Sequence, residues 1–376
     1  MKRIALFMII VISLIFTTGC WDLGEINERI FPYSVGIDVN TNLEEDEEYL
    51  ITFSYPNIDA MGDDPNSDTK VFIISTKANN IFDGVKKLSD RVDKPIDLKH
   101  LKVLAISEEV AKDKKNLLQI VDGLNRDFTI NKAVYLLLTK DIEELFEAKL
   151  ESKRQETIEG LIYTLLRNNQ KSTRFTSRTL NEFIESMDKS SSSFIPLAKA
   201  VNDEIIISGG AVFKDYSLIG HIDEEENRSI NILNKNFSED ELETNYKGTS
   251  LALETTNVKV KKRLDNSDGN LNIVYSVELE GQIQEYILDH GKDLDIKGIH
   301  EMEDALEDKI KRDLQDTVYK IQNELKADII GIGDYIYKYH PKIWRDIKKD
   351  WEDIFPQMDI DVNVEVKIRR RGLVGK

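Results

Sequence analysis

Cysteine and histidine are scarce in this chain. A single cysteine, Cys20, occurs among 376 residues, so no disulfide can form within one molecule and packing alone must stabilise the fold. The histidines are few and dispersed, and no two of them stand four residues apart: His100, His221, His290, His300 and His340. This spacing gives no support to a zinc site built from histidine and cysteine.

Motifs for catalysis are missing as well. Ser208 does not lie in a GxSxG pattern, and Gly331 and Gly333 lack the third glycine of a dinucleotide-binding loop. The segment that begins at Asp38 starts like a calcium loop, but Leu43 stands where that loop requires glycine. We therefore expect no enzymatic activity, no metal site and no bound cofactor.

Positive charge is in deficit. The chain has 51 lysines and arginines against 69 aspartates and glutamates, which gives a formal net charge of −18 at pH 7. Binding to nucleic acid needs basic side chains that displace counterions from phosphates, so nucleic acid is not an expected partner. The same excess of acidic residues argues against a protein that lies flat on anionic lipid.

Long hydrophobic runs are absent except at the N-terminus, where residues 4–16 are apolar apart from Ser13. Lys2 and Arg3 precede this run and Gly19 ends the short polar stretch after it. This order is typical of a secretory signal peptide, and the run is short for a bilayer-spanning helix. We predict that residues 1–19 are a signal peptide; the alternative is an uncleaved N-terminal anchor.

Cys20 follows Gly19 directly, as in a bacterial lipoprotein signal. Cleavage after Gly19 would leave Cys20 as the new N-terminus, carrying a diacylglycerol and an N-acyl chain, and such multiple chains anchor a protein stably. Thr17 departs from the leucine that such signals usually carry three places before the cysteine. The alternative is a free thiol near a cleavage site. No other cofactor is predicted.

Strand-like and helix-like segments alternate through residues 20–195, which predicts an N-terminal α/β domain. Ser107 is expected to cap a helix, and Thr179 with Glu182 forms the sequence pattern of a capping box. The expected strands are β-branched and aromatic-rich stretches at residues 33–39, 49–55, 70–76, 101–106 and 133–139. The serine run at 188–194 predicts a linker or a domain edge.

The rest of the chain predicts two further domains. Residues 196–246 are expected to form a small middle domain, and 247–376 a C-terminal α+β domain. In the last domain, an antiparallel meander and a strand at 359–370 flank a long helix at about 302–327. The predicted fold class is therefore α+β, with three mixed α/β domains and a C-terminal antiparallel meander packed with a long helix.

Aromatic residues gather near the C-terminus, where Trp344 and Trp351 are expected on one helix face. The first interpretation is that they pack onto the sheet. The alternative is a partner surface, since tryptophan is enriched at the centres of interfaces. We name Trp344 and Trp351 as candidate partner-surface residues, together with Trp21 and Asp22 beside Cys20.

Several segments, in this order and with compatible spacing, resemble the Ger(x)C family of spore germination lipoproteins. The first is GCWDLGEIN at 19–27, followed by VGIDV at 35–39. The second covers 79–127, where the family pattern of H-x-K-V-L begins at His100. SGGAVFKDYSLIGHI at 208–222 resembles the middle segment of the family, and 326–372 resembles its C-terminal signature.

This resemblance implies the C subunit of a nutrient germinant receptor. Such a subunit would sit on the outer face of the spore's inner membrane, beside a polytopic B subunit and a larger A subunit, with no enzymatic activity. The alternative function is a solute-binding lipoprotein that delivers a small molecule to a membrane transporter. That class usually has two doubly wound lobes, which the meander and long helix of 247–376 disfavour.

Overall fold

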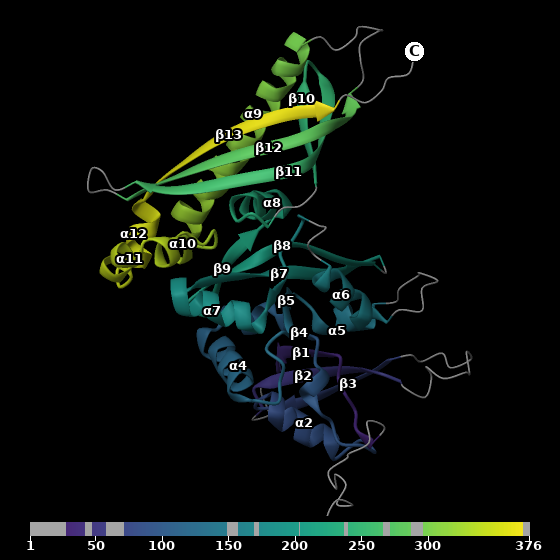
Figure 1. Cartoon of the computed structure of the whole chain (residues 1–376). Coiled ribbons are helices and arrows are strands. Elements are labelled where there is room, and N and C mark those ends of the chain that lie inside the picture. The colour runs from purple at the N-terminus through teal and green to yellow at the C-terminus, as the bar shows by residue number, and fades with distance from the viewer. Residues whose placement is uncertain are drawn as a thin grey trace, which may run out of the picture.

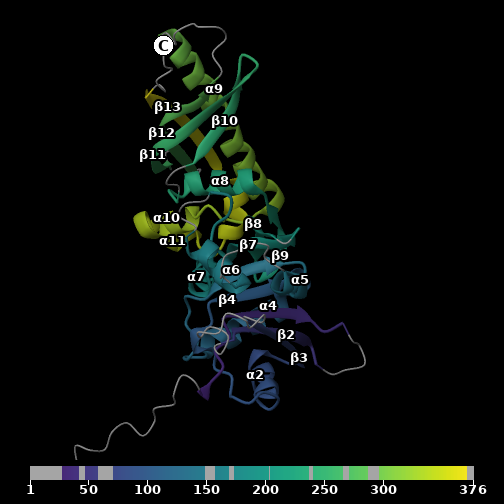
Figure 2. The same ribbon diagram turned by 90° about the vertical axis from the view of Figure 1, so that its right-hand side faces the viewer.

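The computed structural model describes residues 28–41, 47–57, 71–148, 157–168, 173–202, 204–236, 240–265, 271–286 and 296–370. The predicted signal peptide and the predicted site residues Gly19, Cys20, Trp21 and Asp22 lie outside these ranges. Two β-sheets lie one beyond the other along an elongated molecule, and α8 lies between them (Figure 1, Figure 2). None of the helices in the described ranges is long and apolar enough to cross a bilayer.

The first sheet has the strand order β3-β2-β1-β4-β5-β7-β8-β9, and β6 pairs with β5 off this path. Its centre, from β1 through β4 and β5 to β7, is parallel, and its two flanks are antiparallel. The strands are β1 (Ser34–Val39), β2 (Tyr49–Pro56), β3 (Val71–Ala78), β4 (Val103–Ser107), β5 (Tyr135–Thr139), β6 (Arg178–Thr179), β7 (Ser192–Val201), β8 (Glu204–Lys214) and β9 (Ser217–Ile222).

Helices cover both faces of this sheet. Successive residues of a strand point to opposite faces, so Leu104 packs in one hydrophobic core and Val103 in the other. The first core lies under α2, α3, α4 and α7, and the second under α5 and α6. These helices are α2 (Ile81–Ser89), α3 (Glu108–Lys112), α4 (Lys114–Arg126), α5 (Ile142–Glu147), α6 (Ile158–Arg167) and α7 (Leu180–Ser190).

The predicted helix starts are confirmed by side-chain caps. Ser107 Oγ accepts a hydrogen bond from the Val110 N–H at 3.3 Å at the start of α3. Thr179 and Glu182 form the reciprocal capping box at the start of α7. Each cap satisfies a backbone N–H that has no partner within its own helix, which fixes where the helix begins.

The second sheet has the order β10-β11-β12-β13. Its first three strands form the predicted antiparallel meander, and the last strand pairs parallel to β12. The strands are β10 (Glu241–Tyr246), β11 (Thr249–Asp265), β12 (Asn272–Tyr286) and β13 (Asp359–Arg370). The fold class is thus α+β, as predicted.

The long helix α9 (Ile296–Tyr319) packs along this sheet and continues as the π-helical turn η5 (Lys320–Leu325). The apolar residues that recur at three- and four-residue spacing along α9 and η5 are buried: Met302, Leu306, Ile310, Leu314, Val318 and Ile321. The remaining helices are α8 (Glu224–Leu233), α10 (Ile332–Tyr339), α11 (Pro341–Ile347) and α12 (Trp351–Ile354), with 3-10 turns η3 (Leu98–His100) and η6 (Phe355–Gln357).

The structure corrects the predicted division at residue 196. That position lies inside β7, and β8 and β9 extend the first sheet through antiparallel pairing, so 196–246 has no sheet of its own. The serine run that predicted a linker contributes Ser192 and Ser193 to β7, where each is only 2% exposed. The second sheet begins at β10, ahead of the predicted boundary at 247.

Candidate functional site

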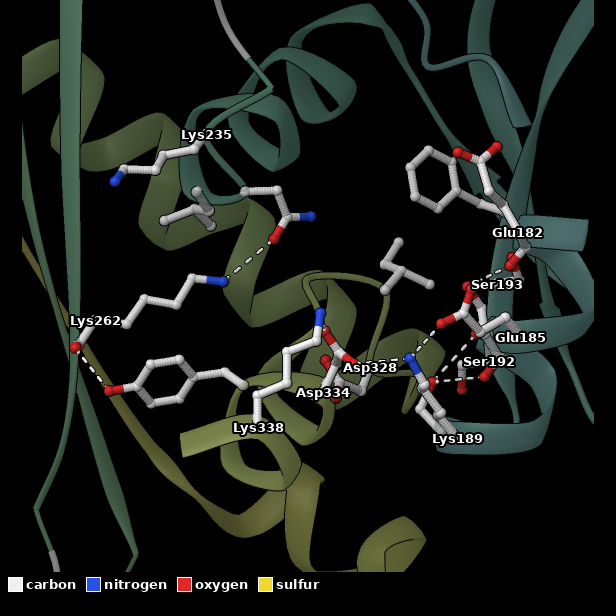
Figure 3. Close-up of a pocket in the computed structure, with 18 of the residues that line it drawn as sticks. Glu182, Glu185, Lys189, Ser192, Ser193, Lys235, Lys262, Asp328, Asp334 and Lys338 are labelled. Carbon is white, nitrogen blue, oxygen red and sulfur yellow. Dashed lines mark hydrogen bonds and ion pairs between the residues drawn. The ribbon is translucent and has the colours of Figure 1, made fainter. Parts of the chain in front are cut away.

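A cavity of about 720 Å³ lies where the two sheets meet. On the side of the first sheet its lining comes from β6, α7 and the start of β7. On the side of the second sheet its lining comes from β11, α10 and the turn that follows η5. Charged side chains from both sides project toward one another across this space (Figure 3).

The turn between η5 and α10 is organised by Asp328, which is 4% exposed. Its carboxylate accepts hydrogen bonds from the N–H groups of Ile332 at 3.0 Å and Gly333 at 2.7 Å, at the start of α10. Gly331, with φ 68°, supplies the left-handed conformation that this turn requires. Burial raises the pKa of Asp328, although the two N–H groups and the charge of Lys262 act in the opposite direction.

Lys262 approaches the same turn from β11. Its Nζ lies 3.3 Å from both Asn234 Oδ1 and the Ile330 carbonyl oxygen. The ammonium group also lies 5.2 Å from the centre of the Tyr275 ring, which is a cation–π contact. Burial lowers the pKa of Lys262 to about 8, against the charges of Asp328 and Asp334, which raise it.

An ion-pair network joins the two sides of the cavity. Lys189 Nζ of α7 lies 3.0 Å from Asp334 Oδ1 of α10 and 2.5 Å from Glu185 Oε1 of its own helix. Lys338 Nζ binds the other Asp334 oxygen at 2.6 Å (Figure 3). The two lysines hold the pKa of Asp334 below its usual range despite its partial burial. Lys189 and Asp334 therefore tie the first sheet to the second.

The two C-terminal tryptophans named from the sequence, Trp344 and Trp351, lie beside Gly333 at the start of α10 but differ in exposure. Trp351 is 3% exposed and packs inside the second core, whereas Trp344 is partly exposed. Their rings meet edge to face with centroids 5.4 Å apart. Trp351 is thus placed as in the packing interpretation, and its ring offers almost no surface to a partner. The single helix predicted here is divided into α11 and α12.

Sequence reasoning missed the residues that line the cavity. Lys262 had a signal, because it follows Val258 and Val260 at period two and so occupies an inward-facing position of β11. Asp328 and Asp334 had no such signal, since acidic residues occur throughout the sequence. Within the ranges that the structure describes, no three His, Cys, Asp or Glu side chains are grouped so as to hold a metal ion.

Comparisons with known families cover nearly the whole chain. Residues 22–200 match the family model of the spore germination protein N-terminal domain. Residues 208–372 match the model described as spore germination B3/GerAC like, C-terminal. The gap between the two matches falls at the hairpin that joins β7 to β8.

Relatives of full length were also found. Spore germination protein B3 of Bacillus subtilis (strain 168) is 23% identical over 382 residues, with 100% of each chain covered. Spore germination protein A3 of the same organism is 23% identical over 373 residues, with 97% of each chain covered. The crystal structure of the GerBC protein matches with a TM-score of 0.58 and 20% identity, covering 90% of this chain and 98% of that one. This structural match supports the fold.

Proposed function

The chain belongs to the spore germination B3/GerAC family, and from this membership we propose that it is a lipid-anchored, non-catalytic subunit of a spore germinant receptor. The observation that carries the proposal is the match of both family models, in order, along residues 22–200 and 208–372. The printed names of full-length relatives, such as spore germination protein B3 and spore germination protein KC, support a role in germination.

The proposed anchor is the lipid on Cys20. Its support is the position of the only thiol in the chain, directly after Gly19 and the apolar run at 4–16. Removal of residues 1–19 would take away Lys2 and Arg3, so the formal net charge would change from −18 to −20. Such an acidic body is repelled by anionic lipid, so acyl chains rather than the protein surface would hold it at the membrane.

The proposed partners are the polytopic B subunit and the A subunit of the receptor, on the outer face of the spore's inner membrane. The role is that of an assembly or signalling subunit, and we propose no reaction for it. The fold is compatible with such a role, because the partly buried ion pair of Lys189 with Asp334 and a shared core join its two sheets into one elongated body. A body of this shape can contact a membrane partner at a distance from its own anchor.

The test compares Cys20→Ala with Ser13→Ala, a control that changes the apolar run but keeps the cysteine. In a sporulating host, we expect Cys20→Ala to accumulate as the uncleaved precursor or to leave the membrane fraction, and nutrient-triggered germination to slow. Ser13→Ala should behave like the wild type. Normal processing and full membrane retention of Cys20→Ala would contradict the proposed anchor, and unchanged germination of a deletion strain would contradict the role.

A further inference from the structure

The lining of the cavity between the sheets carries an excess of positive charge, although the whole chain carries −18. Four of the lining side chains are acidic: Glu182, Glu185, Asp328 and Asp334. Six of them are basic: Arg178, Lys189, Lys235, Lys261, Lys262 and Lys338. A local excess of two cations in such an acidic protein needs a physical reason, because the average surface position favours the opposite sign.

The acidic groups of the lining already have partners. Asp334 is bound by Lys189 and Lys338, and Lys189 also binds Glu185. Asp328 accepts two backbone N–H groups at the start of α10. Glu182 accepts hydrogen bonds from the backbone N–H and the hydroxyl group of Thr179, both at 2.8 Å. No lining carboxylate therefore forms an ion pair with Lys262 or Arg178, although Asp328 and Asp334 act on Lys262, and Glu182 on Arg178, at longer range.

Two of those cations, Lys262 and Arg178, lie in the cavity wall with no carboxylate of the described residues at ion-pairing distance. Among the described residues, neither Lys262 nor Arg178 forms an ion pair. The Arg178 guanidinium lies over the Phe194 ring at 4.9 Å, and its buried Nε has no hydrogen-bond partner. The buried hydroxyl of Ser193, which also lines the cavity, lacks a partner too. Burial lowers the pKa of Arg178, as it does for Lys262.

A buried cation that has no carboxylate in contact with it costs stability, and an anion from solution would offset that cost. Guanidinium and ammonium groups are the usual protein ligands of carboxylate and phosphate oxygens. The volume of about 720 Å³ is larger than one inorganic ion needs and lies within the range of roughly 300–1,000 Å³ that is typical of small-molecule sites.

We propose that this cavity binds a small organic oxyanion through carboxylate or phosphate groups, with Arg178 on one side of the cavity and Lys262 on the other. Arg178 belongs to β6 of the first sheet and Lys262 to β11 of the second, so the ligand bridges the two sheets. Its binding stabilises their association and raises the temperature at which the chain unfolds. This inference goes beyond the role proposed above, because it concerns a ligand site and not the anchor or the partner subunits.

The test uses the full-length chain in a nonionic detergent, titrated with malonate and, separately, with inorganic phosphate. Chloride at matched ionic strength is the reference for non-specific screening. We expect at least one of the two anions to bind saturably, with millimolar or tighter affinity in calorimetry, and to raise the midpoint of thermal unfolding. A preference for malonate would assign a carboxylate ligand, and a preference for phosphate would assign a phosphorylated one.

Substitutions of the two proposed ligand residues, compared with a control substitution elsewhere, test where the anion binds. Lys262→Gln and Arg178→Gln should each weaken binding at least tenfold, whereas Lys311→Gln, on the exposed side of α9, should leave it unchanged. If Arg178→Gln fails to fold, as judged by circular dichroism, the binding affinity of Lys262→Gln alone decides whether the anion binds in this cavity. Absence of saturable binding by both anions would overturn the proposal, and so would equal affinity of the wild type and Lys262→Gln.

A pH series provides a readout that needs no substitution. The charged groups that act on Lys262 are Asp328 and Asp334, which favour its protonated form, and Lys235 and Lys338, which disfavour it. Because the pKa of Lys262 is about 8, anion affinity in the wild type should fall between pH 7 and pH 9. Affinity that stays constant over this interval would contradict the assignment of Lys262 to the site.

Discussion

The backbone N–H of Val366 in β13 donates a hydrogen bond to Glu307 Oε1 in α9 over 2.8 Å. Two residues further on, the Ile368 N–H donates to Glu303 Oε1 over 2.9 Å. β13 is the last strand of its sheet, and these N–H groups face away from β12. Unpaired N–H groups on an edge strand are a template for pairing with another chain, so α9 protects this edge with its glutamates.

Removing both carboxylates should expose the edge. For the double variant Glu303→Ala/Glu307→Ala we expect a loss of about 2 kcal/mol in the free energy of unfolding, and self-association that grows with concentration. Denaturant titration and size-exclusion chromatography with light scattering measure the two effects. Asp304→Ala, on the exposed face of the same helix, is the control. A variant that stays monomeric and as stable as this control would refute the edge-protection account.

The backbone conformation of Gly209 and the lack of space around it explain why the SGGAVF segment has a glycine at this position. Gly209 has φ 59°, and a Cβ atom there would lie 2.3 Å from the carbonyl oxygen of Ile222. Gly248, in the turn between β10 and β11, has φ 83° but open space around it. Alanine at either position must adopt a left-handed backbone conformation, which costs about 1 kcal/mol of folding free energy. Only Gly209→Ala also brings the new Cβ atom into a clash with a backbone atom.

We therefore expect Gly209→Ala to lose at least about 3 kcal/mol of folding free energy, against about 1 kcal/mol for Gly248→Ala. Denaturant unfolding of the two variants beside the wild type measures the difference. Similar losses in both variants would show that the contact with Ile222 contributes nothing.

The lowered pKa of Lys262 leads to a specific prediction for the dependence of stability on pH. Its pKa is about 8 in the folded chain and about 10.4 in an unfolded chain, so between these values the unfolded state binds more protons. Stability must then rise with pH in that interval, by up to about 3 kcal/mol from this one group. Lys262→Met removes the titration, so the free-energy difference between wild type and variant should shift in favour of the wild type from pH 7 to pH 10.5.

Measuring both proteins at both pH values cancels the titration of all other groups. A difference that does not change with pH would mean that Lys262 has an ordinary pKa in the folded chain. Below pH 8 the charged Lys262 reduces stability, which is the cost that a bound anion would offset.

Periodicity in the sequence predicted much of this fold. The buried stripe of α9, from Met302 to Ile321, follows the helical spacing of its apolar residues, and the meander before it follows alternation. Caps such as Ser107 and Thr179 were also predictable, because they act on N–H groups only three residues away. Local rules suffice where the partners of an interaction are close in sequence.

Features that depend on distant partners were not predictable. Ser192 and Ser193 resemble a linker, yet they are buried because β7 pairs with β8 and joins the first sheet beside β5. The cavity has the same origin, since Arg178 and Lys262 reach the lining of one cavity only through the packing of the two sheets. Trp344 and Trp351 were expected on one helix face, but they belong to α11 and α12, their rings are in contact, and their exposure depends on the second core.

The most direct test of the central claim is the mass of the N-terminal peptide of the protein isolated from membranes of sporulating cells. The account predicts a peptide that begins at Cys20 and carries a diacylglycerol, with or without an N-acyl chain. A peptide that begins at Met1, or one with an unmodified Cys20 thiol in the membrane-bound protein, would contradict it.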